Sequence, residues 1–275
     1  MSLVARVSKA IERIAPLQLA DTTWDNVGLL IEPPYPRPNA NQIFLTIDLT
    51  PRVLDEAFSY DRLGMIIAYH PPLFKPIKRL CLDDPKQNMA MKCISRGVAV
   101  FSPHTAVDSS VGGVNDWIAS GLGEGTTKPI TPADNPPEGH EGAGMGRLST
   151  LHKPTLLENI IERVKKHFQL SHVRIATVEE GMKQEIKTIG ICAGSGSMLL
   201  STPADLFLAG EMSHHDVLAA NANGTSVILC EHSNTERGYL SAVLKGKLEE
   251  ALAQDGGEPI EIIVSKEDRD PLRVV

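Results

Sequence analysis

Cysteine is scarce in this chain, and its four cysteines lie far apart. They are Cys81, Cys93, Cys192 and Cys230, and no two of them form a C-x-x-C pair. Zinc fingers need clustered thiolates, and small secreted scaffolds need a dense set of disulfides, so the sequence disfavours both classes. We expect reduced thiols in a cytosolic-type compartment.

Long apolar runs and basic clusters are also lacking. No stretch reaches the length of a membrane span, and the first residues, MSLVARVSKAIERIAPL, have neither the apolar core nor the cleavage site of a secretory signal. The net charge is −7, from 27 Lys and Arg against 34 Asp and Glu. This balance disfavours direct binding to nucleic acid or to an anionic membrane. We predict a soluble protein of the cytoplasm, with the nucleus and the mitochondrion as alternative compartments.

What the chain does have is a regular alternation of apolar and amphipathic segments. Continuous, partly β-branched apolar runs predict buried strands, and apolar residues at helical spacing predict helices that pack on them. Strands that alternate with helices indicate an α/β fold with mostly parallel strands. The predicted strands are 43–48, 64–70, 97–102, 173–177, 186–192, 206–209, 226–230 and 260–264, and the main predicted helices are 3–14, 50–60, 86–96, 112–122, 156–168, 213–221 and one that follows 235.

A segment rich in proline and glycine divides this pattern. Residues 124–146 contain four prolines and several glycines, with little that can pack into a core. The chain length of 275 residues allows one or two domains. We therefore predict an amino-terminal α/β lobe over 1–123, this connector, and a carboxy-terminal α/β lobe over 147–275. The two lobes are expected to be similar and to pack around a central cleft.

Side chains that can bind metals follow three of the predicted strands. His70 ends one strand, His104 and Asp108 follow the next, and His232 and Glu236 follow a strand near the end of the chain. Open α/β sheets bind ligands at the carboxyl ends of their strands. His232 and Glu236 are four residues apart and project from one side of a helix that starts early enough. Two imidazoles with two carboxylates suit zinc, iron or manganese better than calcium or magnesium.

Each of these residues also has an ordinary structural role open to it. His70 could cap a loop, Asp108 could form an Asx-turn, and Glu236 could be a first-turn carboxylate favoured by the helix dipole. Their shared position after apolar strands favours the metal site over three unrelated structural roles.

Two further segments are weaker candidates. The segment GEMSHHD contains His214 and His215, but adjacent helical residues point to different faces, so at most one of them could face a site. The glycine turn CAGSGS, at 192–197, could bring backbone N–H groups to a phosphate or carboxylate. It matches neither the P-loop pattern nor the dinucleotide-binding pattern.

Six motifs, in their order along the chain, resemble one known family. WDNVGLL, AYHPPLF, SPHTAVDSSVGGVNDWIA, AGSGS, DLFLAGEMSHHD and EHSNTERGYL lie between Trp24 and Leu240, and they resemble the Nif-three-like (Ngg-interacting-factor-three-like) family. The motifs SPHTA and YHPP are similar to its eukaryotic branch, which lacks the inserted domain of many bacterial members. The resemblance implies two α/β lobes with the Nif-three-like fold, assembled into a toroidal homohexamer with a dinuclear metal site.

The resemblance also implies a ligand set for that site. It carries the metal-binding role over onto His70, Asp108, His232 and Glu236, with Glu236 as the bridge. Many bacterial members have two successive histidines before the proline, whereas this chain has Tyr69 before His70. A neutral phenol is a poor ligand at neutral pH, so we expect one or two divalent ions.

The activity that the resemblance implies is that of a type 2 GTP cyclohydrolase I-like hydrolase. A metal-activated water would attack a carbon of a purine nucleotide, such as C8 of the guanine in GTP, and His104 or His215 would transfer protons. The alternative is a non-catalytic protein that handles metal or binds a protein partner, since the family name records binding to a transcriptional adaptor.

Overall fold

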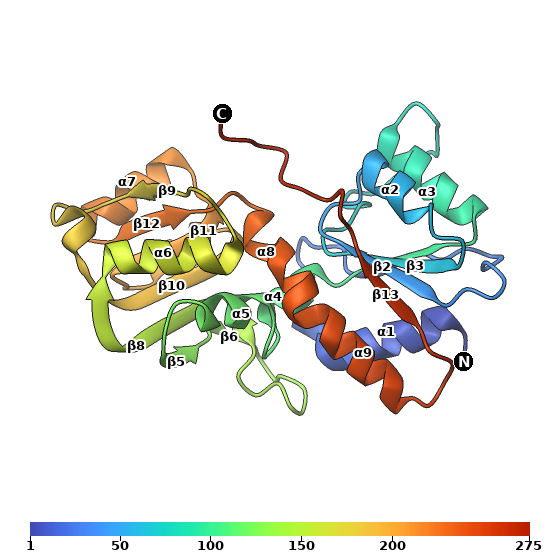
Figure 1. Ribbon diagram of the computed structural model, residues 1–275, viewed down its shortest axis with the longest axis horizontal. Helices are drawn as coiled ribbons and strands as arrows, with labels where there is room; N and C mark the ends of the chain where they lie inside the picture. Colours follow the sequence, from blue (N-terminus) through green and yellow to red (C-terminus); the bar gives the residue numbers. More distant parts are fainter. The chain divides into compact units, whose positions relative to one another are not determined.

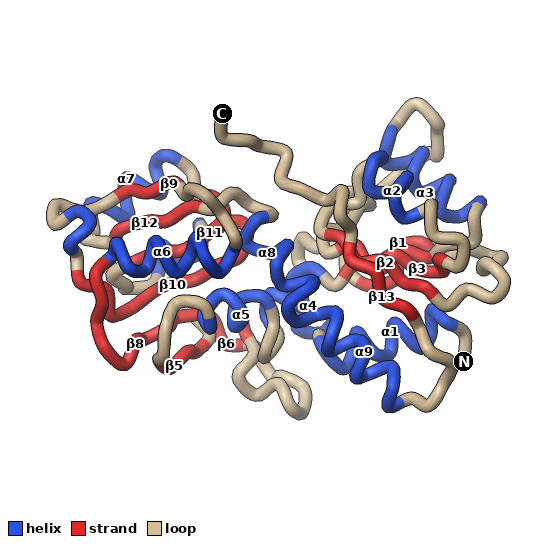
Figure 2. Tube along the Cα trace, in the orientation of Figure 1, coloured by secondary structure: helices blue, strands red, loops and turns tan.

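The structure is a computed structural model that describes residues 1–275. The chain forms two compact units. The first contains Met1–Val107 and Tyr239–Arg269, and the second contains Asp108–Gly238 and Asp270–Val275. Both units combine a β-sheet with helices (Figure 1 and Figure 2), which confirms the predicted α/β class.

The first unit contains a five-stranded sheet in the order β1-β4-β3-β2-β13. Strands β13, β2, β3 and β4 are parallel to one another, and β1 pairs antiparallel with β4 at the edge of the sheet. Strands β2, β3 and β4 are buried along their whole length, which explains why they are continuous apolar runs in the sequence. The strands are Gly28–Ile31 (β1), Gln42–Thr46 (β2), Leu63–Ala68 (β3), Ala99–Ser102 (β4) and Glu261–Val264 (β13).

Helices cover both faces of this first sheet. Helices α1 (Leu3–Ile14) and α9 (Lys245–Gln254) pack together on one face, and α2 (Pro51–Ala57) and α3 (Pro85–Ser95) lie on the other (Figure 1). Helix α2 begins with a proline behind its cap residue Thr50, whose hydroxyl accepts a backbone hydrogen bond, as the sequence predicts.

The ends of β3 and β4 position two of the candidate residues. The N–H of His70 donates a hydrogen bond to the Ile47 carbonyl oxygen at 3.0 Å, so strand pairing extends up to the residue before the prolines. His104 follows β4 and begins α4 (His104–Ser109). This helix was not predicted, because six residues are too few for a helical period to be recognised.

The second unit contains a six-stranded sheet in the order β5-β8-β10-β11-β12-β9. Strands β10, β11 and β12 are parallel, and the other neighbours pair antiparallel. The segment 124–146, predicted as a connector, lies within this unit and contains β5 and the small β6-β7 sheet. The strands are Gly125–Lys128 (β5), Thr131–Pro132 (β6), Gly144–Met145 (β7), Arg147–Leu156 (β8), Arg174–Ala176 (β9), Glu185–Ser195 (β10), Leu206–Glu211 (β11) and Ser226–Leu229 (β12).

Helix α6 shows most clearly how the sequence encodes this unit, because its predicted apolar face, from Leu157 to Phe168, is buried. After α8 the chain continues through one π-helical segment, Leu240–Leu244, into α9. None of the helices combines the length and the apolar character that a membrane span requires. The helices of the second unit are Val114–Ser120 (α5), Leu157–Phe168 (α6), His214–Ala222 (α7) and Asn234–Tyr239 (α8), whose last residue is assigned to the first unit. Short 3-10 turns occur at Leu17–Leu19 in the first unit and at Gly181–Lys183 and Ser197–Ser201 in the second.

Candidate metal site

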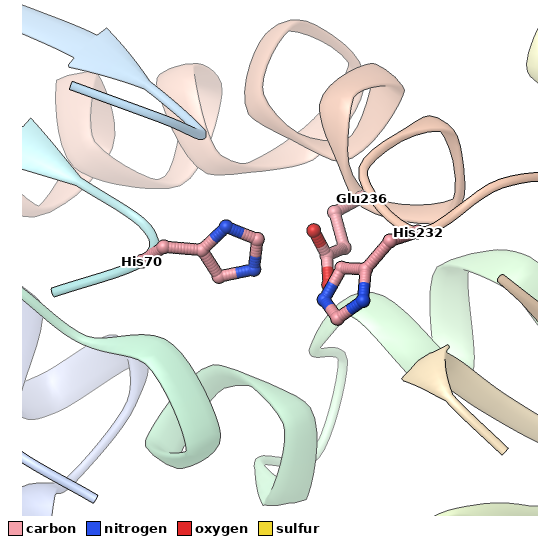
Figure 3. Close-up of side chains that lie close together, drawn as sticks. All are labelled: His70, His232 and Glu236. Atoms are coloured by element: carbon pink, nitrogen blue, oxygen red, sulfur yellow. The ribbon is translucent and has the colours of Figure 1, made fainter. Parts of the chain in front are cut away.

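His232 and Glu236 face each other in the second unit, just after β12 (Figure 3). His232 lies in the turn that leads into α8, two residues before the helix, and Glu236 lies in the first turn of the helix. His232 Nε2 is 3.6 Å from Glu236 Oε1. Glu236 is only 2% exposed, whereas the His232 side chain is 37% exposed. A buried carboxylate needs compensating positive charge or hydrogen bonds, so this pair suits a cation.

Two glycines leave room for the His232 and Glu236 side chains. Gly194, the second-to-last residue of strand β10, has a φ of +63°, and a Cβ atom there would lie 2.7 Å from His232 Nε2 and 3.0 Å from Glu236 Oε1. A Cβ atom on Gly210 in β11 would lie 2.7 Å from the Gly194 carbonyl oxygen. Any larger residue would therefore displace the pair or the strand ends. The sequence prediction for Gly194 was an anion-binding turn. The signal that could have shown its role beside His232 is that Gly194 and Gly210 both lie near the ends of neighbouring strands.

Asp108 lies in the same region of the second unit. Burial raises the pKa of the Cys192 thiol to about 12, and the carboxylates of Asp108 and Glu236 contribute to the shift. The second unit places His232 beside Glu236, and a ligand role for Asp108 stays a prediction.

A buried asparagine connects the segments that present these ligands. Asn115 in α5 is 1% exposed; it donates from Nδ2 to the Asp108 carbonyl oxygen at 3.0 Å and accepts at 2.8 Å from the N–H of the residue before Gly194. Gly194 donates from its N–H to Thr235 Oγ1 at 2.9 Å, and Thr235 donates to the His232 carbonyl oxygen at 2.7 Å. These four hydrogen bonds fix the backbone of three site segments relative to one another.

Replacing Asn115 with leucine is expected to weaken metal binding about 10- to 100-fold, because supporting residues outside the ligand set contribute effects of this size. Stability should also fall by about 1–3 kcal/mol, since two backbone groups lose their partner. Chelator competition measures the first effect and urea unfolding the second. Asn221→Leu is the matched control, because Asn221 Nδ2 also donates to a backbone carbonyl in this unit, at 2.9 Å. Equal metal affinity in the two variants would refute the positioning role of Asn115.

The first unit contributes two histidines whose rings lie edge to face. The ring centroids of His70 and His104 are 5.2 Å apart at an interplanar angle of 88°. His70 Nδ1 is 2.9 Å from Asp48 Oδ1, and His104 Nδ1 is 2.7 Å from Asp25 Oδ1. Tyr69 is fully buried and its ring contacts both histidines. Because each Nδ1 is paired with a carboxylate, Nε2 is the atom that each ring offers to a metal or to a transferred proton.

Asp25 is the more deeply buried of the two carboxylates. Burial alone raises its pKa, but the hydrogen bonds from His104 and Thr105 lower it by more, so the pKa of Asp25 lies below its ordinary value. A folded pKa below the unfolded one means that ionised Asp25 stabilises the fold at neutral pH. This contribution begins to fall near the unfolded pKa of about 3.9 and is lost as the pH drops through the folded pKa.

Asp25→Asn is therefore expected to destabilise the protein more at neutral than at acidic pH. The loss should be about 1.5–3 kcal/mol at pH about 7, the usual contribution of hydrogen bonds to a charged group, and much less near pH 3. Urea unfolding at both pH values measures it, with Asp55→Asn, an exposed carboxylate on α2, as the control. If Asp25→Asn loses the same free energy of unfolding at both pH values, the stabilisation by Asp25 does not depend on its ionised form.

A ligand set for one metal ion can be assembled from residues whose orientation is fixed. In the second unit, His232 offers an imidazole nitrogen and Glu236 a carboxylate oxygen to a metal ion, and in the first unit His70 offers a second imidazole; Figure 3 labels the three side chains. His232 Nδ1 lies 2.9 Å from Glu211 Oε1, just as His70 Nδ1 pairs with Asp48. Carboxylates paired with imidazoles in this way fix the tautomer and raise the basicity of the ligand nitrogen. The chemistry of the donors therefore fits a divalent transition metal.

His214 and His215 lie at the exposed start of α7. Ser213 caps this helix, and the two imidazole rings contact each other with centroids 5.4 Å apart. A proton-transfer role for His215 stays a prediction.

Comparisons with known proteins point to one family. The family model Duf34/NIF3 (NGG1p interacting factor 3) matches residues 2–271. The chain is 43% identical to Protein NIF3 homolog of Schizosaccharomyces pombe, with 98% of each chain covered. It is 39% identical to NGG1-interacting factor 3 of Saccharomyces cerevisiae, with 98% of this chain and 96% of the relative covered.

Solved structures share the fold. The crystal structure of a Bacillus cereus protein related to NIF3 matches with a TM-score of 0.81, at 20% identity and with 98% of each chain covered. A hypothetical protein of Staphylococcus aureus matches with a TM-score of 0.83, at 22% identity and with 99% of each chain covered. Together with the family match, these structures confirm the fold expected from the six motifs.

Proposed function

Because the chain belongs to the Duf34/NIF3 family, we propose that it is a metal-dependent, hydrolase-like protein whose metal ligands are His70, Asp108, His232 and Glu236. The observation that supports this most directly is the buried Glu236 carboxylate facing the His232 imidazole, in a space that Gly194 keeps open. A side chain at position 194 would crowd His232 Nε2, the nitrogen that the Glu211 contact leaves for a ligand.

In the proposed reaction, Glu236, His104 and Asp25 would each have a separate role. A bound divalent ion lowers the pKa of a water molecule and polarises the substrate. Glu236, buried and anionic, would neutralise the ion and bridge to a second one if two are bound. His104 Nε2 would accept a proton, and the Asp25 carboxylate at its Nδ1 would stabilise the imidazolium that forms.

The substrate to test first is a purine nucleotide, because the motif resemblance is to type 2 GTP cyclohydrolase I-like proteins. Hydrolysis at C8 of the guanine in GTP would release formate. The same resemblance leads us to propose a homohexamer, and the widely spaced cysteines lead us to propose a cytoplasmic location.

The decisive experiment combines elemental analysis of the purified protein with an assay of formate release from GTP. We expect one or two ions of zinc, iron or manganese per chain, and formate release that stops when a chelator removes them. One ion per chain would indicate that Tyr69, in place of a second histidine, has removed half of a dinuclear centre. A folded, metal-free protein with no turnover under any divalent ion would refute the hydrolase proposal.

A second candidate is a protein-binding role. The Saccharomyces cerevisiae relative is named as an NGG1-interacting factor, and the same kind of partner is proposed here as the alternative. A variant with His232→Ala and Glu236→Ala separates the two candidates. If a cellular phenotype of deletion is rescued by this metal-deficient variant, binding is the function; if it is not rescued while the variant is folded, metal chemistry is.

A further inference from the structure

A pocket lined by cationic side chains follows His70 in the first unit. It has a cavity volume of about 490 Å³ and is formed by residues 72–79 together with the start of α3. One carboxylate lines it, that of Asp84, and this carboxylate already accepts a hydrogen bond from the Gln87 N–H at 3.0 Å as the cap of α3. The cationic residues that line it are Lys75, Lys78, Arg79 and Lys86. We refer to this cavity as the 72–87 pocket.

These four cations have no carboxylate partner within the chain. Every ion pair of the structure involves other residues. The protein as a whole carries a net charge of −7. A local excess of four positive charges around one pocket is therefore opposite in sign to the charge of the protein as a whole. Mutual repulsion opposes such a cluster unless an anion neutralises it. Lysine and arginine together are the usual ligands of phosphate groups.

The segment that carries the cations is tied down by hydrogen bonds. The Asn26 side chain donates to the Leu73 carbonyl oxygen before the basic stretch. Beyond it, the Cys81 N–H donates to Gln87 Oε1 at 2.7 Å, and Asn88 Nδ2 donates to the Leu82 carbonyl oxygen at 2.9 Å. Both ends of the segment are therefore anchored, one to the turn before β1 and the other to α3.

Exposed aromatic rings connect the pocket to the proposed metal ligand. Phe74 lines the pocket and is 39% exposed, and its ring lies 6.0 Å from the Trp24 ring, which is 50% exposed. Trp24 in turn lies 5.8 Å from His104, and His104 lies 5.2 Å from His70. The indole is held in place by its Nε1–H, which donates to Asp21 Oδ2 at 2.8 Å. Exposed aromatic faces bind flat, apolar ring systems by stacking.

We propose that the 72–87 pocket binds the phosphate groups of a small-molecule substrate, and that Trp24 and Phe74 bind its planar body on the side of His70. The identification of the ligand as a substrate rests on the proposed function. Phosphate binding by Lys75, Lys78 and Arg79 does not depend on the metal, so the two can be tested separately.

The first test measures inorganic pyrophosphate binding by calorimetry in a Glu236→Gln background, where chelation of a bound metal does not interfere. Charge-assisted contacts are strong, so the triple variant Lys75→Gln, Lys78→Gln and Arg79→Gln should bind at least about tenfold more weakly. The control is Lys153→Gln, Lys166→Gln and Lys183→Gln, which removes the same charge from exposed positions of the second unit and should bind within about twofold of its parent. Circular dichroism checks that both triple variants are folded.

A second arm tests the aromatic part of the proposal. Phe74→Ala should weaken binding of GTP about fivefold or more, as expected for loss of a stacking contact, and leave pyrophosphate binding unchanged. Equal weakening by both triple variants, or no pyrophosphate binding by the parent at millimolar concentration, would overturn the phosphate site. Metal content of the pocket triple variant in the wild-type background should match the wild type; its loss would show that the pocket residues act on the metal centre instead.

Discussion

Glu236→Gln is expected to abolish tight metal binding and to leave the metal-free protein at least as stable as the wild type. Glutamine keeps the volume of the buried side chain and removes its charge. In the metal-free wild type, the Glu236 carboxylate is buried. A carboxylate resists burial when no metal ion neutralises it. The substitution relieves this cost and at the same time removes an anionic ligand.

Unfolding in the presence of a chelator and in the presence of Zn²⁺ measures both effects. An ion that binds only the folded state stabilises it by about 2.7 kcal/mol at a free concentration 100 times its Kd. The wild type should gain this amount and Glu236→Gln should gain none. Glu56→Gln is the control, since Glu56 accepts hydrogen bonds from Ser265 and Lys266 in the first unit. It should lose stability and keep the full gain from Zn²⁺. A full gain in Glu236→Gln would remove Glu236 from the ligand set.

The parts of the structure that could be predicted from the sequence are those encoded by local pattern. Strands β2 and β3 are continuous apolar runs because parallel strands are covered on both faces. The cap at Thr50 and the apolar face of α6 depend on residues only a few positions apart. His232 and Glu236 are also near neighbours in the sequence, but α8 begins at Asn234, so His232 lies in the turn before the helix and not on its face as the prediction required.

The contacts that complete the site could not be read from local pattern. Asp25 and His104 are 79 positions apart, and Asn115 bonds to a backbone N–H 78 positions away. Nothing near Asn115 in the sequence marks it as a bridge between α5 and β10. The positive φ of Gly194 and its approach to His232 Nε2 likewise depend on how β10 and α8 pack. Such long-range contacts are set by the assembled sheet, so a single sequence identifies the residue types and leaves their partners open.

Gly194→Ala is expected to lose metal binding by at least about 100-fold while the protein still folds. Its Cβ atom would lie 2.7 Å from His232 Nε2, the nitrogen that the Glu211 pairing leaves for the metal. One of the two must move. The His232 side chain is 37% exposed and can rotate toward solvent, whereas Glu236 is buried and cannot. The imidazole would therefore leave the site, and the variant would fold but lose His232 as a metal ligand.

The backbone strain of this substitution can be separated from its effect on the metal site. Alanine at a positive φ costs about 1–2 kcal/mol wherever it occurs. Gly181 has a φ of +58°, close to the +63° of Gly194, and a Cβ atom there meets nothing within 4 Å. Gly181→Ala should therefore lose a similar unfolding free energy and bind metal as the wild type does. Chelator competition with both variants decides the matter: if they bind metal equally well, the space beside His232 is not reserved for a ligand, and the glycine serves only the turn at the end of β10.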